Sequence, residues 1–460
     1  MKMKKFIILA VCLSISGLAL GISLQESLEL AKQGNKELLK AKEDIYKADA
    51  TYKDVRGNLL PQLSLQGGYS LSKTYLPDAA TAPAYDFTTG LDALASDNDE
   101  YLAQSLNGLV SAFSPSSPVK EGSLAMQLKF QQVLFMGAKL INGVKAVDRY
   151  RSIQKLRYNL VENEIVVSTT DLFYQCLLAQ KLVTVQEEAM AIANRHLSRV
   201  ELFWSEGQVS EFDVLRARLE VAKLQPQLIQ SRNNYDLALS AFRKQIGTSD
   251  ITVVPEGEFI LPQELALTET EAVDEGLRNR LELKLASINT EIQGIRYKAE
   301  KGNYLPNIAL TADASLYTAA DEYKIEGDDF GTSYSVGIGF SLPLFTGFSN
   351  SSKKAFARHD HVLAQIQEQD YRELIALEIK QNFQNLHYAY ETYKVQAENI
   401  KLAERNLQLA QVRFENQVGI QLEVFDAQIM LSALKLEYFN TIFQVISAER
   451  KLSKSLGHNL

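Results

Sequence analysis

One stretch of alternating residues constrains the fold of this chain more than any other. Residues 334–347 have the sequence YSVGIGFSLPLFTG, and as far as Leu342 every second side chain is apolar, with serine or glycine between. A period of two predicts a β-strand with one apolar face and one small polar face. A length of about ten residues suits a tilted strand that crosses a bilayer. The stretch therefore predicts a membrane strand.

Three further stretches share this alternation, namely residues 62–71, 124–131 and 307–317. A soluble β-sandwich would also alternate, so one such strand alone would decide nothing. Four strands cannot close a membrane barrel, because the smallest such barrels have about eight. An open sheet edge in lipid leaves backbone groups unpaired, at several kcal/mol each. We therefore expect one chain to supply a fraction of a barrel that several copies complete.

The N-terminus has the composition of an export signal. Three lysines within the first five residues precede an apolar run from Phe6 to Leu20, and small residues follow it. This pattern predicts a signal peptide over residues 1–21. The chain that remains holds one cysteine, Cys176, so no internal disulfide is possible and a buried thiol is expected.

Composition and motifs argue against several classes of function. No later stretch approaches eighteen consecutive apolar residues, so no helical membrane span is predicted. A net charge of −8 argues against nucleic acid as a partner. His359 and His361 are two residues apart and point to different helix faces, so they do not suggest a metal site. No catalytic motif is present, and we expect neither an enzyme nor a cofactor.

Very long helices are the second feature of the sequence. Residues 144–206 contain no glycine or proline, which predicts roughly 95 Å of continuous helix. Residues 348–415 and 420–456 also lack both glycine and proline. Helices of this length exceed those of ordinary domains. They predict an intermolecular coiled coil, a stalk or a helical tube.

The chain also repeats itself. Leu60-Pro61 recurs as Leu305-Pro306, 245 residues later, whereas Leu134-Phe135 recurs as Leu344-Phe345, 210 residues later. The shorter offset then continues without a gap from Gly137/Gly347 to Gly247/Gly457. The change of offset predicts that the first hairpin loop is about 35 residues longer than the second.

The sequence therefore predicts a mainly α fold with membrane β-strands, built from a duplicated unit of helix, β-hairpin and long helix pair. The expected parts are a first repeat over 22–247 (initial helix 23–57, hairpin 62–133 with a long loop 72–121, helix pair 138–246), a linker over 248–266, and a second repeat over 267–460 (hairpin 307–343, helix pair 348–456). Part of the long loop, residues 91–109, is predicted to form a short helix.

These features together resemble the TolC-like outer-membrane efflux protein family, the outer-membrane factor of tripartite efflux and type I secretion systems. The matching motifs are the two Leu-Pro pairs, FSLPLFTG at 340–347, and the turns GQVSEFDVLRA at 207–217 and QVGIQLEVFDA at 417–427. The resemblance implies a homotrimer whose strands form one twelve-stranded barrel, continuous with a periplasmic tunnel of helices. It also implies an exit duct for small molecules or secreted proteins, which works with an inner-membrane pump and a periplasmic adaptor.

The resemblance also assigns roles to residues near the two turns. It implies that Glu423 and Asp426, three apart on one helix face, form carboxylate rings at a closed periplasmic entrance and favour cations. A solvated outer face is the alternative. Asp213 matches a family position that holds the entrance shut through a salt bridge and a hydrogen bond to a tyrosine. The partner positions in this chain are Phe414 and Gly419, which can form neither of these two contacts. We expect a different or looser closure, with helix capping as the alternative role of Asp213.

The turns themselves match the family's adaptor-docking region, and their exposed valines suit such a contact. The residues concerned are Gly207, Gln208 and Val209 in the first turn, and Gln417, Val418 and Gly419 in the second. Ordinary helix-hairpin turns are the alternative. Trp204 and Phe414 occupy equivalent positions before the turns and are expected to pack the hairpins.

Two other functions are compatible with the sequence. A coiled-coil stalk with a small membrane anchor would be structural or adhesive and would carry no current. A periplasmic scaffold without a barrel would be extracted without detergent. The substrate, the matching pump and adaptor, and the purpose of the loop 72–121 do not follow from the sequence.

Overall fold

A computed structural model describes residues 20–74, 86–91, 96–113, 119–262, 266–321, 326 and 330–458. Residues 1–19, which hold nearly all of the predicted signal peptide, lie outside this part. The chain divides into two compact units. The helical unit comprises the described residues of Met1–Ala50, Val147–Gly294 and His359–Leu460. The strand unit comprises those of Thr51–Ala146 and Ile295–Arg358.

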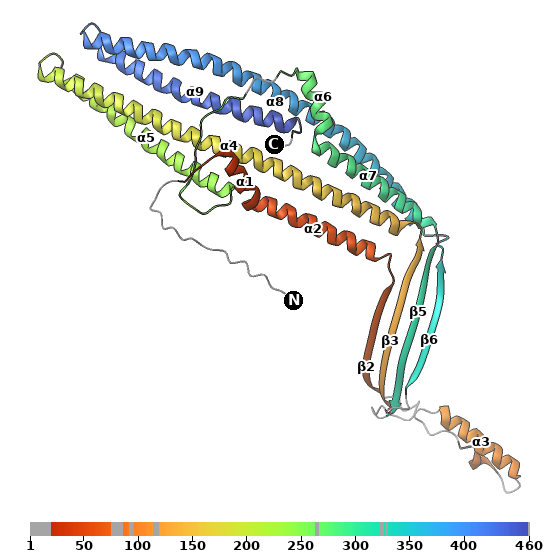
Figure 1. The fold of residues 1–460 in the computed structure, drawn as a ribbon. Coiled ribbons are helices and arrows are strands. Elements are labelled where there is room, and N and C mark those ends of the chain that lie inside the picture. Colours follow the sequence, from red (N-terminus) through yellow and green to blue (C-terminus); the bar gives the residue numbers. More distant parts are fainter. Residues whose placement is uncertain are drawn as a thin grey trace, which may run out of the picture. The chain divides into compact units, whose positions relative to one another are not determined.

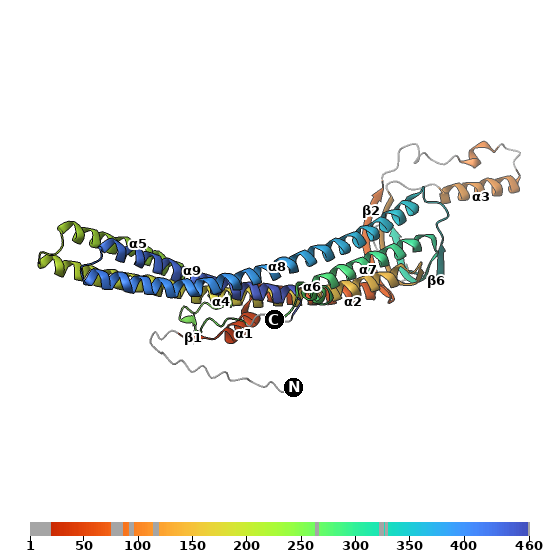
Figure 2. The same ribbon diagram turned by 90° about the horizontal axis from the view of Figure 1, so that it is seen from above.

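Two pairs of very long helices dominate the helical unit (Figures 1 and 2). The pairs are α4 (Lys139–Ser205) with α5 (Glu211–Gln245), and α8 (Ser349–Glu415) with α9 (Gln421–Ser455). The shorter helices are α1 (Leu24–Gly34), α2 (Lys36–Gly57), α6 (Glu269–Asn279) and α7 (Leu281–Lys301). A short parallel pair joins β1 (Leu20–Ile22) to β4 (Val253–Pro255). Among the described residues, no helix is both long and apolar enough to cross a membrane.

The predicted single helix over 23–57 is wrong, because the chain breaks it at Asn35. This residue has an extended backbone between α1 and α2. Its side-chain oxygen accepts a hydrogen bond from the Glu37 amide at 2.9 Å, and its amide nitrogen donates to the Gln245 carbonyl at 3.0 Å. Asparagine satisfies a free amide at a helix start in this way. The side chain thus starts α2 and ties it to the end of α5.

Four antiparallel strands form the strand unit, in the order β2-β3-β5-β6. They are β2 (Gln62–Thr74), β3 (Val119–Met136), β5 (Asn307–Asp321) and β6 (Gly331–Ser341). The register sets Leu65 opposite Leu128, and Leu310 opposite Ile338, so the apolar residues share one face. On the other face Lys129 lies opposite Asp313, which accepts a hydrogen bond from Ser335.

The duplication predicted from the sequence is confirmed residue by residue. The pair Gln62 and Gln131 between β2 and β3 corresponds to the pair Asn307 and Ser341 between β5 and β6, at offsets of 245 and 210. The offset of 210 also carries the bounds of α4 onto those of α8, and the bounds of α5 onto those of α9. Each repeat therefore contributes one β-hairpin and one long helix pair.

The long first loop contains more structure than expected. The strands β2 and β3 extend into the range 72–121 that was predicted as loop. The predicted short helix is α3 (Asp97–Phe113), and it follows the 3₁₀ turn η2 (Phe87–Gly90). Asn107 of α3 donates to Asp86 at 2.6 Å and accepts from the Phe87 amide at 2.9 Å. These bonds hold the turn against the helix.

Buried side chains form three clusters within the helical unit. The first gathers Phe173, Cys176 and Phe242 with residues of α1, α2 and α9. Cys176 is a buried free thiol, as predicted, and its burial raises its pKa to about 12. A second cluster lies near the long turns and a third includes Ile379 and Leu452.

The two repeats meet in the strand unit through two glycines. Gly137 has a positive φ of 55°, and its backbone lies against that of Gly302. A Cβ atom on either residue would overlap the backbone carbonyl of the other. Only glycine fits this contact, which joins the end of β3 to the segment before β5.

We expect Gly302→Ala to destabilise the protein by about 1–3 kcal/mol, because the added methyl group overpacks the contact with Gly137. The measurement is the heat-unfolding midpoint by circular dichroism in detergent. Gly143→Ala is the matched control, since a Cβ there meets only a Val55 methyl at 4.0 Å. That control should be neutral or stabilising by up to ~1 kcal/mol. Equal midpoints for both variants would contradict the tight contact.

Candidate functional site

Two tight turns end the long helix pairs, and they touch each other. Gly207 lies in the turn between α4 and α5, and Gln417 occupies the equivalent position between α8 and α9. Both have a positive φ, 73° and 61°. The Gln417 amide donates to the Gln208 side-chain oxygen at 2.8 Å. The turns of the two repeats are thus joined by residues singled out in the sequence.

A compact apolar cluster supports the turns. Phe414 is buried in it and lies 5.9 Å from Phe203, measured between ring centroids. Trp204, at the equivalent position in the first repeat, remains 49% exposed. The expectation that both aromatic residues pack the hairpins is therefore right for Phe414 and wrong for Trp204. The second repeat covers Phe203 and Phe414 within the chain, but no described residue covers Trp204 to the same degree.

Asp213 caps α5. Its carboxylate accepts hydrogen bonds from the Ser210 amide at 3.0 Å and from the Ser210 hydroxyl at 2.6 Å. The Ser210 hydroxyl in turn accepts from the Asp213 amide at 3.3 Å, which completes a capping box. Of the roles considered for Asp213, this geometry matches capping. It forms no ion pair with another described residue.

Glu423 is the equivalent of Asp213 and does something different. Ile420 stands where Ser210 stands in the first turn, so α9 has no side-chain cap. The carboxylate of Glu423 instead accepts a hydrogen bond from the Arg413 guanidinium at 3.3 Å. Gly419 makes this possible, because a Cβ there would lie 2.9 Å from both side chains.

Arg413 was missed from the sequence. The sequence did contain a signal for it. Ile420 replaces the equivalent Ser210 at the cap position, so the Glu423 carboxylate has no capping partner, and a basic residue lies across the turn.

Asp426 differs from Glu423. Its side chain is exposed and forms no ion pair within the described residues. It lies beside a hollow of about 740 Å³ on the face of α8 and α9, also lined by Leu402, Ala403 and Met430. The two carboxylates predicted as a set therefore differ in their ion pairing: Glu423 has a basic partner, and Asp426 has none in the described chain.

The turn valines also differ from each other. Val418 is 71% exposed, as expected. Val209 is half-buried against the cluster under the turns, so the expectation that it is exposed is wrong. Val418 and the neighbouring Ile420, which is 61% exposed, are therefore apolar side chains that the second turn presents to solvent.

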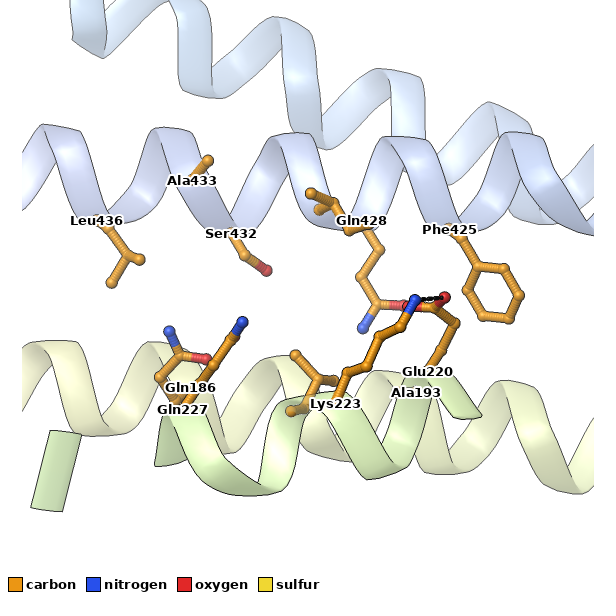
Figure 3. A pocket seen from close by; sticks show the side chains of 12 residues that line it. Gln186, Ala193, Glu220, Lys223, Gln227, Phe425, Gln428, Ser432, Ala433 and Leu436 are labelled. Atoms are coloured by element: carbon orange, nitrogen blue, oxygen red, sulfur yellow. Dashed lines mark hydrogen bonds and ion pairs between the residues drawn. The ribbon is translucent and has the colours of Figure 1, made fainter. Parts of the chain in front are cut away.

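A cavity of about 370 Å³ separates α9 from α4 and α5 (Figure 3). Its walls carry the amide side chains of Gln186, Gln227 and Gln428 beside Leu436. Lys223 and Glu220 form an ion pair at one side, at 2.7 Å. The Gln428 amide donates to the Ala189 carbonyl at 2.8 Å. The cavity lies where the second repeat packs on the first.

The side chain of His196 is buried beneath the turns, and its pKa is shifted. It is only 8% exposed, and its ring lies 5.0 Å from those of both Phe414 and Phe425. Its Nε2 atom has no hydrogen-bond partner among the described residues. Burial, and secondarily the charge of Arg199, lowers its pKa from 6.5 to about 4. No group of three His, Cys, Asp or Glu in the described residues is placed to hold a metal ion.

Comparison with known proteins identifies relatives along nearly the whole chain. The model of a family described as "Outer membrane efflux protein" matches residues 27–248 and 272–458. "Outer membrane protein TolC" of Salmonella enteritidis is 21% identical over 469 residues, which span 99% of this chain and 87% of the relative.

Solved structures share the fold. The outer membrane protein VceC of Vibrio cholerae superposes with a TM-score of 0.72 at 16% identity, over 95% of this chain and 96% of that one. The MtrE outer membrane channel of Neisseria gonorrhoeae, solved in an open state, gives 0.70 at 14% identity, over 97% and 93%. These matches confirm the predicted fold class of duplicated long helical hairpins with membrane strands.

We expect the stability of the helical unit to fall as the pH falls from about 6.5 to 4. In this range the unfolded chain protonates His196 and the folded chain does not, so the unfolded state binds more protons. The loss amounts to about 3 kcal/mol. The measurement is chemical unfolding at a series of pH values, compared between the wild type and His196→Leu, whose pH slope should be shallower.

The exposed His387 provides the control for this comparison. His387→Leu should retain the slope of the wild type. A slope that is the same in all three proteins would show that His196 is not held neutral in the fold.

Proposed function

Because the chain belongs to the outer membrane efflux protein family, we propose that it is the exit duct of an efflux or secretion system. Family membership makes it an outer-membrane protein with a large periplasmic helical part, and a channel component instead of an enzyme. The proposed assembly is a homotrimer with a twelve-stranded barrel. Its proposed partners are an inner-membrane pump and a periplasmic adaptor, and its cargo is small molecules or secreted proteins.

The free edges of the sheet carry this proposal. Within one chain, β3 of the first repeat pairs with β5 of the second, while β2 and β6 remain edge strands. Unpaired edges do not persist in lipid. The repeat offsets convert the β3–β5 register into a register for β6 of one copy with β2 of the next. Met126 opposite Leu316 becomes Val336 opposite Leu71 of the next copy.

The chemistry of the two edges agrees with this register. It also places Ile338 opposite Tyr69, by analogy with Leu128 opposite Ala314. All four side chains named for the seam, Val336, Leu71, Ile338 and Tyr69, then lie on the apolar face. A slip of one residue would turn one strand's apolar side chains to the polar face. The sheet would continue from copy to copy with one apolar surface toward lipid.

The glycine contact between repeats supports the same arrangement. The equivalents of Gly137 and Gly302 are Gly347 and Gly57. Both are glycines, and within the described chain a Cβ atom added to either would meet no other atom within 4 Å. Gly347 also has the positive φ of its equivalent, 58° against 55°. A neighbouring copy would supply the missing half of this contact.

The helices have a matching pair of surfaces. Ala193, Glu220 and Leu224 line the cavity where α9 covers the first repeat. Their equivalents Ala403, Met430 and Leu434 line the hollow on α8 and α9, which no described part of the chain covers. A second copy offers α5 to this face, with Leu215 and Leu219 exposed on it. Such head-to-tail contacts generate a closed ring when the rotation closes.

The turns would form the periplasmic entrance of the duct. In a trimer, Asp426 and Glu423 would each provide a ring of three carboxylates, which attract cations in a narrow pore. The exposed Val418, with Gly207, Gln208, Gln417 and Gly419 around it, would contact the adaptor. Val209 would support the turn from within the cluster.

We expect cysteines at Val336 and Leu71 to form a disulfide between copies, because directly opposite residues in antiparallel strands lie about 4.5–5.5 Å apart. The measurement is a denaturing gel of the oxidised membrane protein, which should show linked dimers and trimers. Cysteines at Val336 and Gln66 are the matched control, since the same register places Gln66 opposite Ser341. Equal linkage of both pairs would contradict the register.

We expect conductance in planar bilayers, which a stalk or scaffold would not give. Glu423→Gln with Asp426→Asn should lower the cation-to-anion permeability ratio by about threefold or more, because the entrance loses its negative charge. Asp370→Asn with Glu373→Gln removes the same charge from an exposed part of α8 and should leave the ratio unchanged. An unchanged ratio in the first variant would remove these residues from the entrance.

A further inference from the structure

We propose that Arg413 of one copy lies over the indole ring of Trp204 of the next copy, and that this contact holds adjacent helix turns in register. The proposal rests on the ring of copies described above. The contact is not present within the single chain, and it does not follow from membership of the family. The partner is a second copy of this chain, and the two residues come from different repeats.

A contact inside the chain defines the geometry. Phe203 of α4 packs on Phe414 of α8, with ring centroids 5.9 Å apart and planes at 45°. Moving each residue by the repeat offset replaces Phe203 with Arg413, and Phe414 with Trp204 of the neighbouring copy. An aromatic pair within the chain thus corresponds to a cation–aromatic pair between chains. Arginine over tryptophan is among the most favourable of such pairs.

Both residues are available for this contact. Trp204 is the only tryptophan of the chain and is half exposed, although its equivalent Phe414 is buried. The Arg413 side chain is 56% exposed. A large aromatic side chain left in solvent beside a buried cluster is typical of an interface residue.

Two polar contacts in the second turn fix the position of the Arg413 side chain. Its Nε atom donates to the Glu423 carboxylate at 3.3 Å, and its Nη2 atom lies 3.5 Å from the Val418 carbonyl oxygen. Both partners lie toward the edge of the planar guanidinium group. Its face remains free to stack on an aromatic ring while its edge is bonded. Gly419 leaves the space that the pair with Glu423 needs.

The contact has a consequence for the width of the entrance. It copies a contact made within the chain, so it forms when the six helix pairs of a trimer are evenly spaced. Drawing α8 and α9 inward, out of line with α4 and α5, would separate Arg413 from Trp204 of the next copy. The contact therefore favours the even, wider ring.

The direct test uses cysteines at Trp204 and Arg413 with a short bismaleimide in the full-length membrane protein. Cys176 is buried and its thiol has a raised pKa, so it should remain unlabelled. We expect linked dimers and trimers on a denaturing gel. A cysteine at the exposed Leu202, combined with one at Arg413, is the matched control and should link far less.

The two cysteine pairs distinguish a failure of the Arg413–Trp204 contact from a failure of the proposed ring of copies. No linkage through Trp204 and Arg413, with normal linkage through Val336 and Leu71, overturns the contact and leaves the ring intact. No linkage through either pair overturns both. Linkage as efficient from Leu202 as from Trp204 also overturns the specific contact.

Fluorescence and conductance test the cation–aromatic chemistry itself. In Arg413→Leu, the single tryptophan should become more accessible to acrylamide, and open probability should fall by about two- to fivefold. Trp204→Ala should lower open probability equally, and the double variant should add nothing further. Trp204→Phe should give an intermediate value, because it keeps a weaker aromatic face.

Lys401→Gln is the control. It removes an exposed charge from α8 and should change neither the fluorescence nor the open probability. Additive effects, or an open probability that stays the same or rises, would overturn the proposal.

Discussion

The unpaired edges of a four-stranded sheet are the constraint on which the rest of the molecule depends. The strands β2 and β6 each present backbone donors and acceptors that no described part of the chain satisfies. The apolar face of the sheet is suited to lipid, where water cannot replace the missing bonds. The membrane part of a single chain therefore leaves these bonds unmade, and in the proposed assembly a second copy supplies them.

Internal duplication explains how a second copy would fit in the proposed assembly. The junction between repeats inside the chain already contains a strand pairing, a glycine contact and a helix–helix packing. Each has an open counterpart elsewhere in the chain: the edges β2 and β6, the pair Gly57 and Gly347, and the hollow on α8 and α9. In the proposed assembly, the same set of contacts would be used within and between chains. The repeats differ in the length of the hairpin loop, which contains α3 only in the first repeat, and in charged and aromatic residues near the turns.

Much of this architecture could be predicted from the sequence, because it depends on periodicity. Alternation located all four strands, and long stretches without glycine or proline located most of α4, α8 and α9. The apolar spacing of residues 23–57 does not reveal the break at Asn35, although asparagine is a local helix-start signal. The bond from Asn35 to the distant Gln245 carbonyl could not be predicted from the sequence. Arg413 was missed for a similar reason: its pairing with Glu423 depends on the space at Gly419 and the lost cap at Ile420. The exposure of Trp204 could not be predicted, because it depends on which side of each helix pair the other repeat covers.

The claim that one chain supplies a third of a closed wall is tested most directly by its assembled mass. Light scattering coupled to size-exclusion chromatography in detergent gives the mass of protein in the particle separately from the bound detergent. We predict a protein mass of three chains, independent of dilution over the range where the detergent remains above its micelle concentration. A particle that contains a single chain, stable with its sheet edges unpaired, would contradict it.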